Sequence, residues 1–327
     1  MHQSVPLRIL HLASGPVGRY LRASMLPAVL TTFLWSCSSI FAARSARLVG
    51  GAAANLSRMA IAASLLAVWA HTFGRASLGG PALPWFILSG FIGFGVGDVA
   101  MFGALQRVGP RLTMLLTHCL AAPIAAITEY FWMGSKLGYG EIACAVVILA
   151  GVAFALAPDH GSEVTRRTFW IGVLCGIGSG CGQGFSSVIS IRANHAATAA
   201  HLDIPGYHID GATAAYERIM AGIVVAFLFF IFLRGREQKP PAGAWPKAWV
   251  WIAANALAGP CIGVAMYQWS ISMNRAGIVM PVVATAPVLT QFLAWAIDGQ
   301  PPTRRTVLGG VIAVGGVVAL KILLDHS

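Results

Sequence analysis

The chain has 327 residues, of which 57% are hydrophobic and only 10% are charged. Because a soluble domain carries about 25% charged residues, this composition excludes an ordinary soluble protein and predicts a chain that lies mainly in lipid. The formal charge of +11 does not indicate a nucleic-acid partner, since the basic residues are spread singly over predicted loop ends, where they meet lipid headgroups.

Ten apolar stretches follow an N-terminal tail, residues 1–24, and each is long enough for a helix that crosses a bilayer, which needs roughly 20 residues. The predicted spans are 25–43, 55–73, 83–106, 111–132, 140–158, 169–191, 213–233, 247–272, 277–297 and 305–323. No loop between them is long enough to form a soluble domain. The sequence therefore predicts an all-α integral membrane protein with ten transmembrane helices.

Among the first five spans, the third contains a carboxylate, Asp98, well inside its apolar stretch. A charge in the hydrocarbon costs roughly 2.5–3.5 kcal/mol, so such residues are functional candidates by default. Asp98 either binds substrate or a proton in a central cavity, with His118 of the fourth span as its titrating neighbour, or forms a buried hydrogen bond between helices. Arg107 lies half a turn around the same helix and is not expected to pair with it. The first reading predicts that Asp98→Asn abolishes pH-driven transport and leaves folding intact.

The sixth span contains glycines at every fourth position: Gly172, Gly176, Gly180 and Gly184. This spacing places small residues on one stripe of a helix and lets another helix approach closely. A dinucleotide-binding loop is the other reading of these glycines, but no βαβ unit surrounds them. We therefore expect Gly176 and Gly180 to face a neighbouring helix, and Gly180→Leu to lower the folded yield.

Further polar, aromatic and proline residues in the spans could line a cavity or hold helices together. These candidates are Trp35, Gln183, Tyr267, Gln268 and Gln291, with Pro123 and Pro287 as sites of freed backbone carbonyls. We expect no metal site and no cofactor, because the histidines and aspartates of the 193–212 loop do not have the spacing of a zinc motif.

The second five spans repeat the pattern of the first five. Ser38-Ser39 is echoed by Ser186-Ser187, and Arg58 by Arg218. Because the two arginines echo each other, we expect them to be structural, each at a helix entrance with its side chain extending toward the interface. Asp98 has no such twin, since the corresponding position is Gly263.

The repeat predicts a division of the chain into two halves. These are a first five-helix repeat, 25–158, a connecting loop, 159–168, a second repeat, 169–323, with an inserted loop at 193–212, and a C-terminal tail, 324–327. Because five is an odd number, the second repeat must enter the membrane from the opposite side, which gives inverted repeats with a cavity between them. The even total places both termini on the same side.

The order and duplication of these motifs resemble the drug/metabolite transporter superfamily, EamA type, over nearly the full chain. The matching residues are Gly97-Asp98, Phe102, Ala104-Leu105, Arg107, Gly109, Pro123, Met133-Gly134-Ser135, Leu137 and Ile148 to Val152, then Pro287, Gly299-Gln300-Pro301 and Gly316-Val317. The family's turn glutamate is Ser135 in one half and Gln300 in the other. The small multidrug members also have a glutamate in helix 1, which is absent here, so their proton-exchange mechanism is not carried over.

The resemblance implies a secondary transporter of small metabolites, an exporter or exchanger that works by alternating access in a bacterial inner membrane. It also implies cytoplasmic termini, whereas the distribution of Lys and Arg mildly favours the reverse. A flippase for a lipid or lipid-linked substrate is the alternative. A membrane-embedded enzyme is least favoured, because the HExxH and GxSxG motifs are absent. The expected partners are a small-molecule substrate, the lipid bilayer and, as open alternatives, protons and a second copy of the chain.

Overall fold

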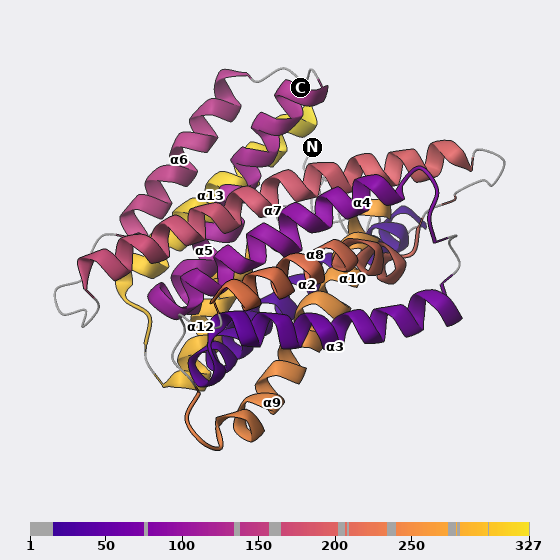
Figure 1. The fold of residues 1–327 in the computed structure, drawn as a ribbon. Helices are drawn as coiled ribbons and strands as arrows, with labels where there is room; N and C mark the ends of the chain where they lie inside the picture. Colours follow the sequence, from indigo (N-terminus) through magenta and orange to yellow (C-terminus); the bar gives the residue numbers. More distant parts are fainter. Residues whose placement is uncertain are drawn as a thin grey trace.

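The structure, a computed structural model, describes residues 16–74, 78–133, 138–156, 165–201, 207, 209–233, 240–273, 279, 282–299 and 301–326. The regular elements within these ranges are helices (Figure 1). The first part of the chain forms α2 (Pro16–Val49), α3 (Gly51–Thr72), α4 (Leu83–Gly90), η1 (Phe91–Gly97), α5 (Asp98–Met133) and α6 (Tyr139–Leu156). The second part forms α7 (Arg166–Ala200), α8 (Gly211–Leu233), α9 (Ala244–Ala256), η2 (Leu257–Cys261), α10 (Ile262–Met273), α12 (Ala286–Asp298) and α13 (Arg304–His326).

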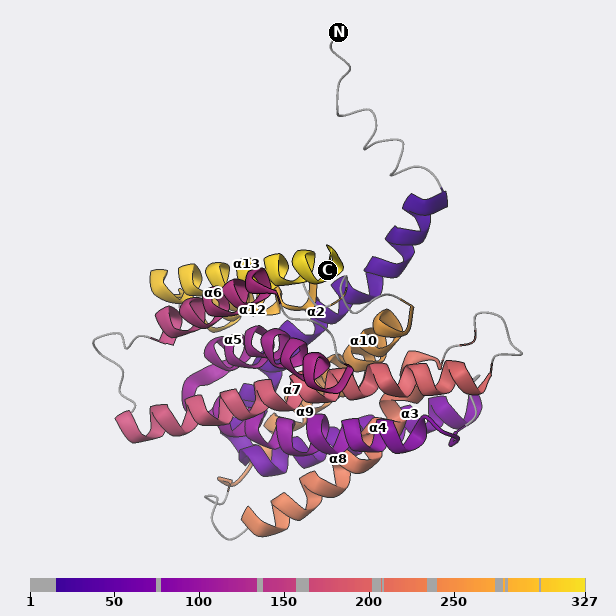
Figure 2. The ribbon, with the colours of Figure 1, turned by 90° about the horizontal axis from the view of Figure 1, so that it is seen from above.

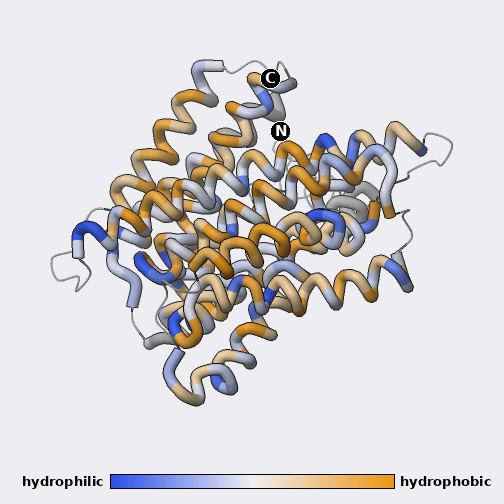
Figure 3. Tube along the Cα trace, viewed as in Figure 1, coloured by the Kyte–Doolittle hydropathy of each residue, from blue (hydrophilic) through white to orange (hydrophobic). Residues whose placement is uncertain are grey.

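Five stretches of the described chain are long and apolar enough to cross a membrane: Leu26–Val49, Gly51–Thr72, Leu83–Trp132, Gly211–Leu233 and Ala244–Ser272. Large apolar side chains are exposed on the outside of the molecule, among them Phe131, Leu174 and Val250. The trace is mostly hydrophobic, and its strongly hydrophilic stretches lie mainly at helix ends (Figure 3). Exposed apolar surface of this extent requires lipid, so the chain is an integral membrane protein.

The stretch Leu83–Trp132 is 50 residues long, more than one crossing needs. Its backbone leaves the helical conformation at Gly109, where φ is 75° and ψ is 174°. Glycine adopts a positive φ without steric cost, and Pro110 begins the helical segment that follows, as prolines often do. The break lies between the predicted spans 83–106 and 111–132.

Helical structure differs from the sequence expectation in three places. α2 already begins at Pro16, within the predicted tail, and α7 continues to Ala200, within the predicted 193–212 loop. The predicted span 277–297 includes a non-helical turn at residues 284–285, after which α12 begins at Ala286. Pro287 therefore lies in the first turn of α12, where a missing N–H breaks no helical hydrogen bond, while Pro123 is inside α5.

Two helix pairs make the most extensive contacts between helices of the first and second parts of the chain. α5 packs along α7, and α6 lies beside α13, as both views of the ribbon show (Figures 1 and 2). Glycines of α7 make the first contact close: a Cβ added at Gly180 would lie 2.8 Å from the Leu116 carbonyl oxygen and 3.1 Å from Leu120 Cβ. An added Cβ at Gly176 would also collide with Leu116. Both glycines thus lie on the face of α7 that contacts α5.

Candidate functional site

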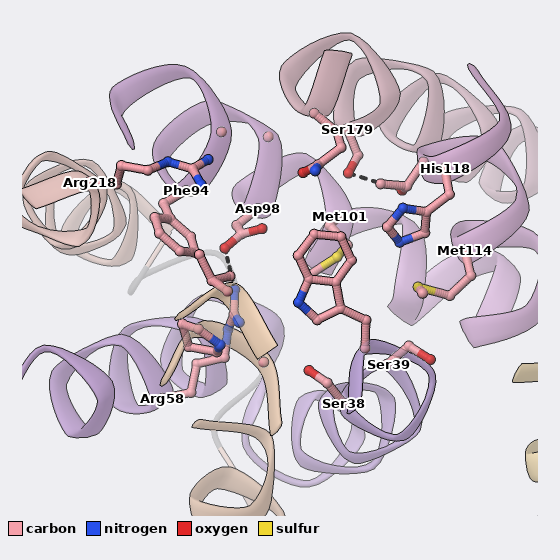
Figure 4. Close-up of a pocket in the computed structure, with 18 residues that line it drawn as sticks. Ser38, Ser39, Arg58, Phe94, Asp98, Met101, Met114, His118, Ser179 and Arg218 are labelled. Atoms are coloured by element: carbon pink, nitrogen blue, oxygen red, sulfur yellow. Dashed lines mark hydrogen bonds and ion pairs between the residues drawn. The ribbon is translucent and has the colours of Figure 1, made fainter. Parts of the chain in front are cut away.

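A pocket lies where helices from both parts of the chain meet (Figure 4). Its lining comes from α2, α3, η1 and α5 of the first part and from α7, α8, η2 and α10 of the second. The lining residues are Trp35, Ser38, Ser39, Arg58, Gly93, Phe94, Gly97, Asp98, Met101, Met114, Thr117, His118, Ser179, Gln183, Arg218, Gly259, Pro260 and Val264. The pocket therefore combines charged, hydroxyl, aromatic and thioether groups.

Arg58 and Asp98 form an ion pair at one side of the pocket, through Nη2 and Oδ2. Arg58 also donates from Nε to Asn55 Oδ1 at 3.0 Å, and its guanidinium carbon lies 4.9 Å from the centre of the Phe102 ring. The side chain of Arg58 is 3% exposed and that of Asp98 is 17% exposed. The expectation that Arg58 extends toward the membrane interface is wrong, because its charge is neutralised inside the protein instead.

Arg218 lies on the other side of Asp98 (Figure 4) and is equally buried, at 3% exposure. Its guanidinium carbon is 5.1 Å from the centre of the Phe94 ring, and Nη2 donates a long hydrogen bond of 3.4 Å to Ser186 Oγ. Its Nε has no acceptor among the described residues. Arg218 also does not reach the interface, which corrects the second arginine prediction.

Glycines in the two π-helical segments make room for the arginines. A Cβ added at Gly93 in η1 would lie 2.7 Å from Ser186 Oγ and 3.2 Å from Arg218 Nη2. A Cβ added at Gly259 in η2 would lie 2.6 Å from Ser38 Oγ and 3.3 Å from Arg58 Nη1. Each guanidinium therefore occupies space that any side chain at these positions would fill.

Trp35 and His118 form a stacked pair of rings in the pocket. Their rings stack with centroids 5.3 Å apart and planes inclined by 23°. His118 lies across the pocket from Asp98 (Figure 4), and the ion-pair partner of Asp98 is Arg58. The charged group in contact with Asp98 is therefore Arg58, while a role for His118 as its titrating neighbour stays a prediction.

Of the predicted substrate-binding residues, Asp98, His118, Trp35 and Gln183 line this pocket. The other three are not in its lining. Tyr267 packs behind Trp35, with ring centroids 5.1 Å apart, and donates to Ser187 Oγ at 3.0 Å. Gln268 donates to Ser190 Oγ at 3.4 Å, and Gln291 donates to the Thr306 carbonyl at 3.1 Å. These three contacts join neighbouring helices, in line with the alternative interpretation that such residues hold helices together.

Sequence reasoning assigned Arg58 and Arg218 to helix entrances and so missed two residues of the pocket lining. The sequence did contain an indication, because both arginines are charged residues inside apolar stretches. Each also comes one helix after a serine pair that recurs in the other half. The serine pairs themselves contribute: Ser38 and Ser39 line the pocket, and Ser186 contacts Arg218.

A set of membrane-length helices around a charged pocket defines an integral membrane protein with a candidate polar site in its interior. The EamA-like transporter family matches residues 22–157 and 206–321, and the chain belongs to this family.

The chain is also similar to two known proteins. A protein of Streptantibioticus cattleyicolor described as a "Probable terminal-alkyne amino-acid exporter" is 23% identical over 297 residues, which cover 90% of this chain and 91% of that protein. A protein of known crystal structure, 20% identical, shares the fold with a TM-score of 0.64 over 93% of this chain and 98% of its own. The family and the exporter-named relative together indicate a small-molecule membrane transporter and point away from an enzyme.

Proposed function

We propose that the protein is a secondary transporter that exports small metabolites across a bacterial inner membrane by alternating access. The observation that carries this proposal is the buried, charged pocket to which both parts of the chain contribute. Charged groups buried inside a membrane protein are costly unless a bound solute or an oppositely charged group compensates them. One ion pair joins two of the charged lining residues, and it leaves the charge of Arg218 to be explained. The name of the Streptantibioticus relative makes amino acids the first compounds to test.

The proposed architecture is a pair of inverted five-helix repeats, 25–158 and 169–323, with both termini cytoplasmic. Contacts between α3 and α8, and between α6 and α13, join helices that the repeat makes equivalent. η1 contacts α7, and η2 contacts α2, so each π-helical segment packs against the other half. The match of the family to two separate segments agrees with a duplication.

The position of the pocket, to which both parts of the chain contribute, supports alternating access. Rocking of one half against the other would open the pocket first to one side of the membrane and then to the other. We retain Asp98 as a polar anchor for substrate or proton, with one change. Because Arg58 already pairs with Asp98, a proton or a cationic group has to compete with that guanidinium.

A flippase for a lipid or lipid-linked substrate is the second candidate. A larger groove, separate from the pocket, is lined by apolar side chains of α5 and α8, among them Val99, Phe102 and Phe229, with Arg47 and Arg107 also in its lining. An acyl chain with an anionic headgroup would suit these surroundings.

Transport by the purified full chain in liposomes distinguishes these functions. Liposomes are loaded with unlabelled amino acids (propargylglycine included), nucleosides, sugars or organic cations, and uptake of the labelled compound is measured with and without an imposed pH gradient. We expect exchange of one class of small solute above that of protein-free liposomes. Movement of fluorescent phospholipid in place of any solute would favour the flippase, and no movement of either would overturn the transporter proposal.

A further inference from the structure

The positive charge of the pocket exceeds its negative charge. Four of the lining residues have ionisable side chains: Arg58, Asp98, His118 and Arg218. The two guanidinium groups stay charged in proteins, so a single carboxylate stands against two fixed cations. A cation taken out of water requires a compensating anion close by. The lining residues supply that anion for one arginine only.

The two arginines differ in how well their donors are used. Arg58 has a carboxylate on Nη2 and an amide oxygen on Nε. Arg218 has one hydroxyl at 3.4 Å, while its Nε has no acceptor among the described residues. Asp98 is close enough to attract Arg218 electrostatically, but its ion pair is with Arg58. Arg218 is therefore a buried cation whose hydrogen-bond donors are only partly satisfied by the described residues.

The sequence repeat explains the difference between the two arginines. Arg58 and Arg218 occupy equivalent positions in the two predicted repeats, and so do Asp98 and Gly263. The first half thus supplies both an arginine and a carboxylate, whereas the second half supplies an arginine and a glycine. An added Cβ at Gly263 would lie 2.8 Å from Trp35 Nε1, so the indole ring occupies the space near this position.

We propose that the transported molecule carries a carboxylate group, and that this group binds the guanidinium of Arg218 as the missing counterpart of Asp98. The inference rests on the transport function proposed above and names its substrate class. A guanidinium matches a carboxylate with two parallel hydrogen bonds, which makes it selective for this group. The cavity is about 60 Å³ in this conformation, so it would have to widen as the halves move; the remainder of the molecule would then lie against Trp35, Met101, Met114 and Val264, which favour an apolar body. Amino acids and simple carboxylic acids share this chemistry.

The test compares three forms of the same apolar body in liposomes that contain the full chain. The probes are leucine, methionine and phenylalanine, each with its primary amide and its deaminated acid. The amide lacks the carboxylate, and the deaminated acid lacks the amino group. We expect transport of the acid-bearing forms and a half-saturation concentration for the amides that is roughly ten- to a hundredfold higher. Transport of the deaminated acids separates simple carboxylates from amino acids as the source.

The variants are Arg218→Gln and Arg218→Lys, with Arg192→Gln as a matched control, because Arg192 is an exposed arginine outside the pocket. We expect Arg218→Gln to raise the half-saturation concentration for the acid at least about tenfold and to leave its amide unchanged. Arg218→Lys should give an intermediate value, because lysine keeps the charge without the planar fork. Arg192→Gln should match the natural sequence.

The melting temperature distinguishes a substrate-binding role of Arg218 from a merely structural one, in which its loss would destabilise the protein. Because its charge is incompletely paired, Arg218→Gln should keep or raise the melting temperature while abolishing the stabilisation that the acid confers. If Arg218→Gln does not fold, the comparison uses Arg218→Lys, and an unchanged half-saturation concentration there overturns the inference. Equal transport of acid and amide also overturns it, as does exclusive transport of compounds without a carboxylate, although the transporter proposal then stands. Absence of transport for every solute overturns both.

Discussion

The ion pair between Arg58 and Asp98 joins α3 to α5 beside the pocket. A buried pair of this kind adds little net stability, since the attraction between the two charges mainly offsets their loss of hydration. Its loss on one side is a different matter, because an uncompensated charge then remains inside the protein. The pair is therefore a constraint on which single substitutions the protein can accept.

Asp98→Asn tests this constraint, and the ion pair changes the expected result for this variant from unimpaired folding to destabilisation. The substitution leaves the guanidinium of Arg58 buried without its carboxylate, which costs about 3–5 kcal/mol. We expect a clear drop in melting temperature in detergent, with much of the loss recovered by Arg58→Gln in the same chain. A melting temperature equal to that of the natural sequence for Asp98→Asn alone would show that the pair does not hold the fold.

At this scale the sequence predicted which residues were unusual but not which of them meet. Asp98, His118, Trp35 and Gln183 were candidates, and all four line the pocket. The pairing of Asp98 with Arg58 could not be derived, because the partners lie 40 positions apart on different helices and their rotation depends on packing. The wide turn of η1 directly before Asp98 adds to this difficulty, since it changes the rotation of every residue after it.

Among the helices, α7 depends most visibly on residues without side chains. Its glycine face contacts α5 so closely that the backbone of the partner helix is within reach of an added methyl group. Close approach of this kind supplies van der Waals contact, which in lipid replaces the hydrophobic effect as a source of helix association. The stripe of glycines is visible in the sequence, but its partner helix is not.

Two alanine variants on α7 separate close packing from helix propensity. At Gly180 an added methyl group would lie 2.8 Å from a backbone oxygen, so Gly180→Ala should destabilise the protein by about 1–3 kcal/mol. At Gly178 the nearest atom would be Ala100 Cβ at 3.6 Å, an ordinary contact, so Gly178→Ala should keep or raise the melting temperature. Equal effects of the two substitutions on thermal unfolding would contradict the packing argument.

Element boundaries were partly predictable for physical reasons. The break in α5 lies at a Gly-Pro pair, Gly109-Pro110, and such pairs mark turns in any sequence. The continuation of α7 through residues 193–200 was not foreseen, because polar residues such as Asn194 and His195 there read as a loop. Once a helix leaves the hydrocarbon it no longer needs apolar residues, so hydropathy does not show where it ends.

For the whole molecule, the two halves meet around the pocket, and each contributes one arginine and one glycine-bearing π-helical segment. The sequence predicts a duplication, since short motifs such as Ser38-Ser39 and Ser186-Ser187 recur in it, and the division into two repeats stays a prediction. It could not predict the departures from symmetry that give the pocket its chemistry. The carboxylate of Asp98 is matched in the sequence repeat by a glycine, Gly263, and the chemical consequence of that difference becomes visible only in the contacts of the two arginines.

The proposed orientation is tested with cysteines introduced at the two ends of α7. Thr165 and Ala200 are exposed residues at opposite ends of this helix, and with cytoplasmic termini Thr165 would lie outside the cell. We expect a membrane-impermeant maleimide to label Thr165→Cys in intact cells and Ala200→Cys only after lysis. The six natural cysteines are buried or half-buried, so background labelling should be low. The opposite labelling order would reverse the orientation, and labelling of both from one side would exclude a membrane-crossing α7.

The wide turn of η1 gives the length of this segment a role of its own. A π-helical turn contains more residues than an α-helical one, so loss of a single residue from Phe91–Gly97 would restore α-helical winding. Each residue of an α-helix turns the chain by about 100°, so everything after the lost residue would rotate away from its partners, Asp98 from Arg58 first of all. Substitutions at exposed positions of this segment, Phe91 and Val96, leave that winding unchanged. Among homologous sequences, the residues of this segment should therefore vary in identity while the length of the segment stays constant.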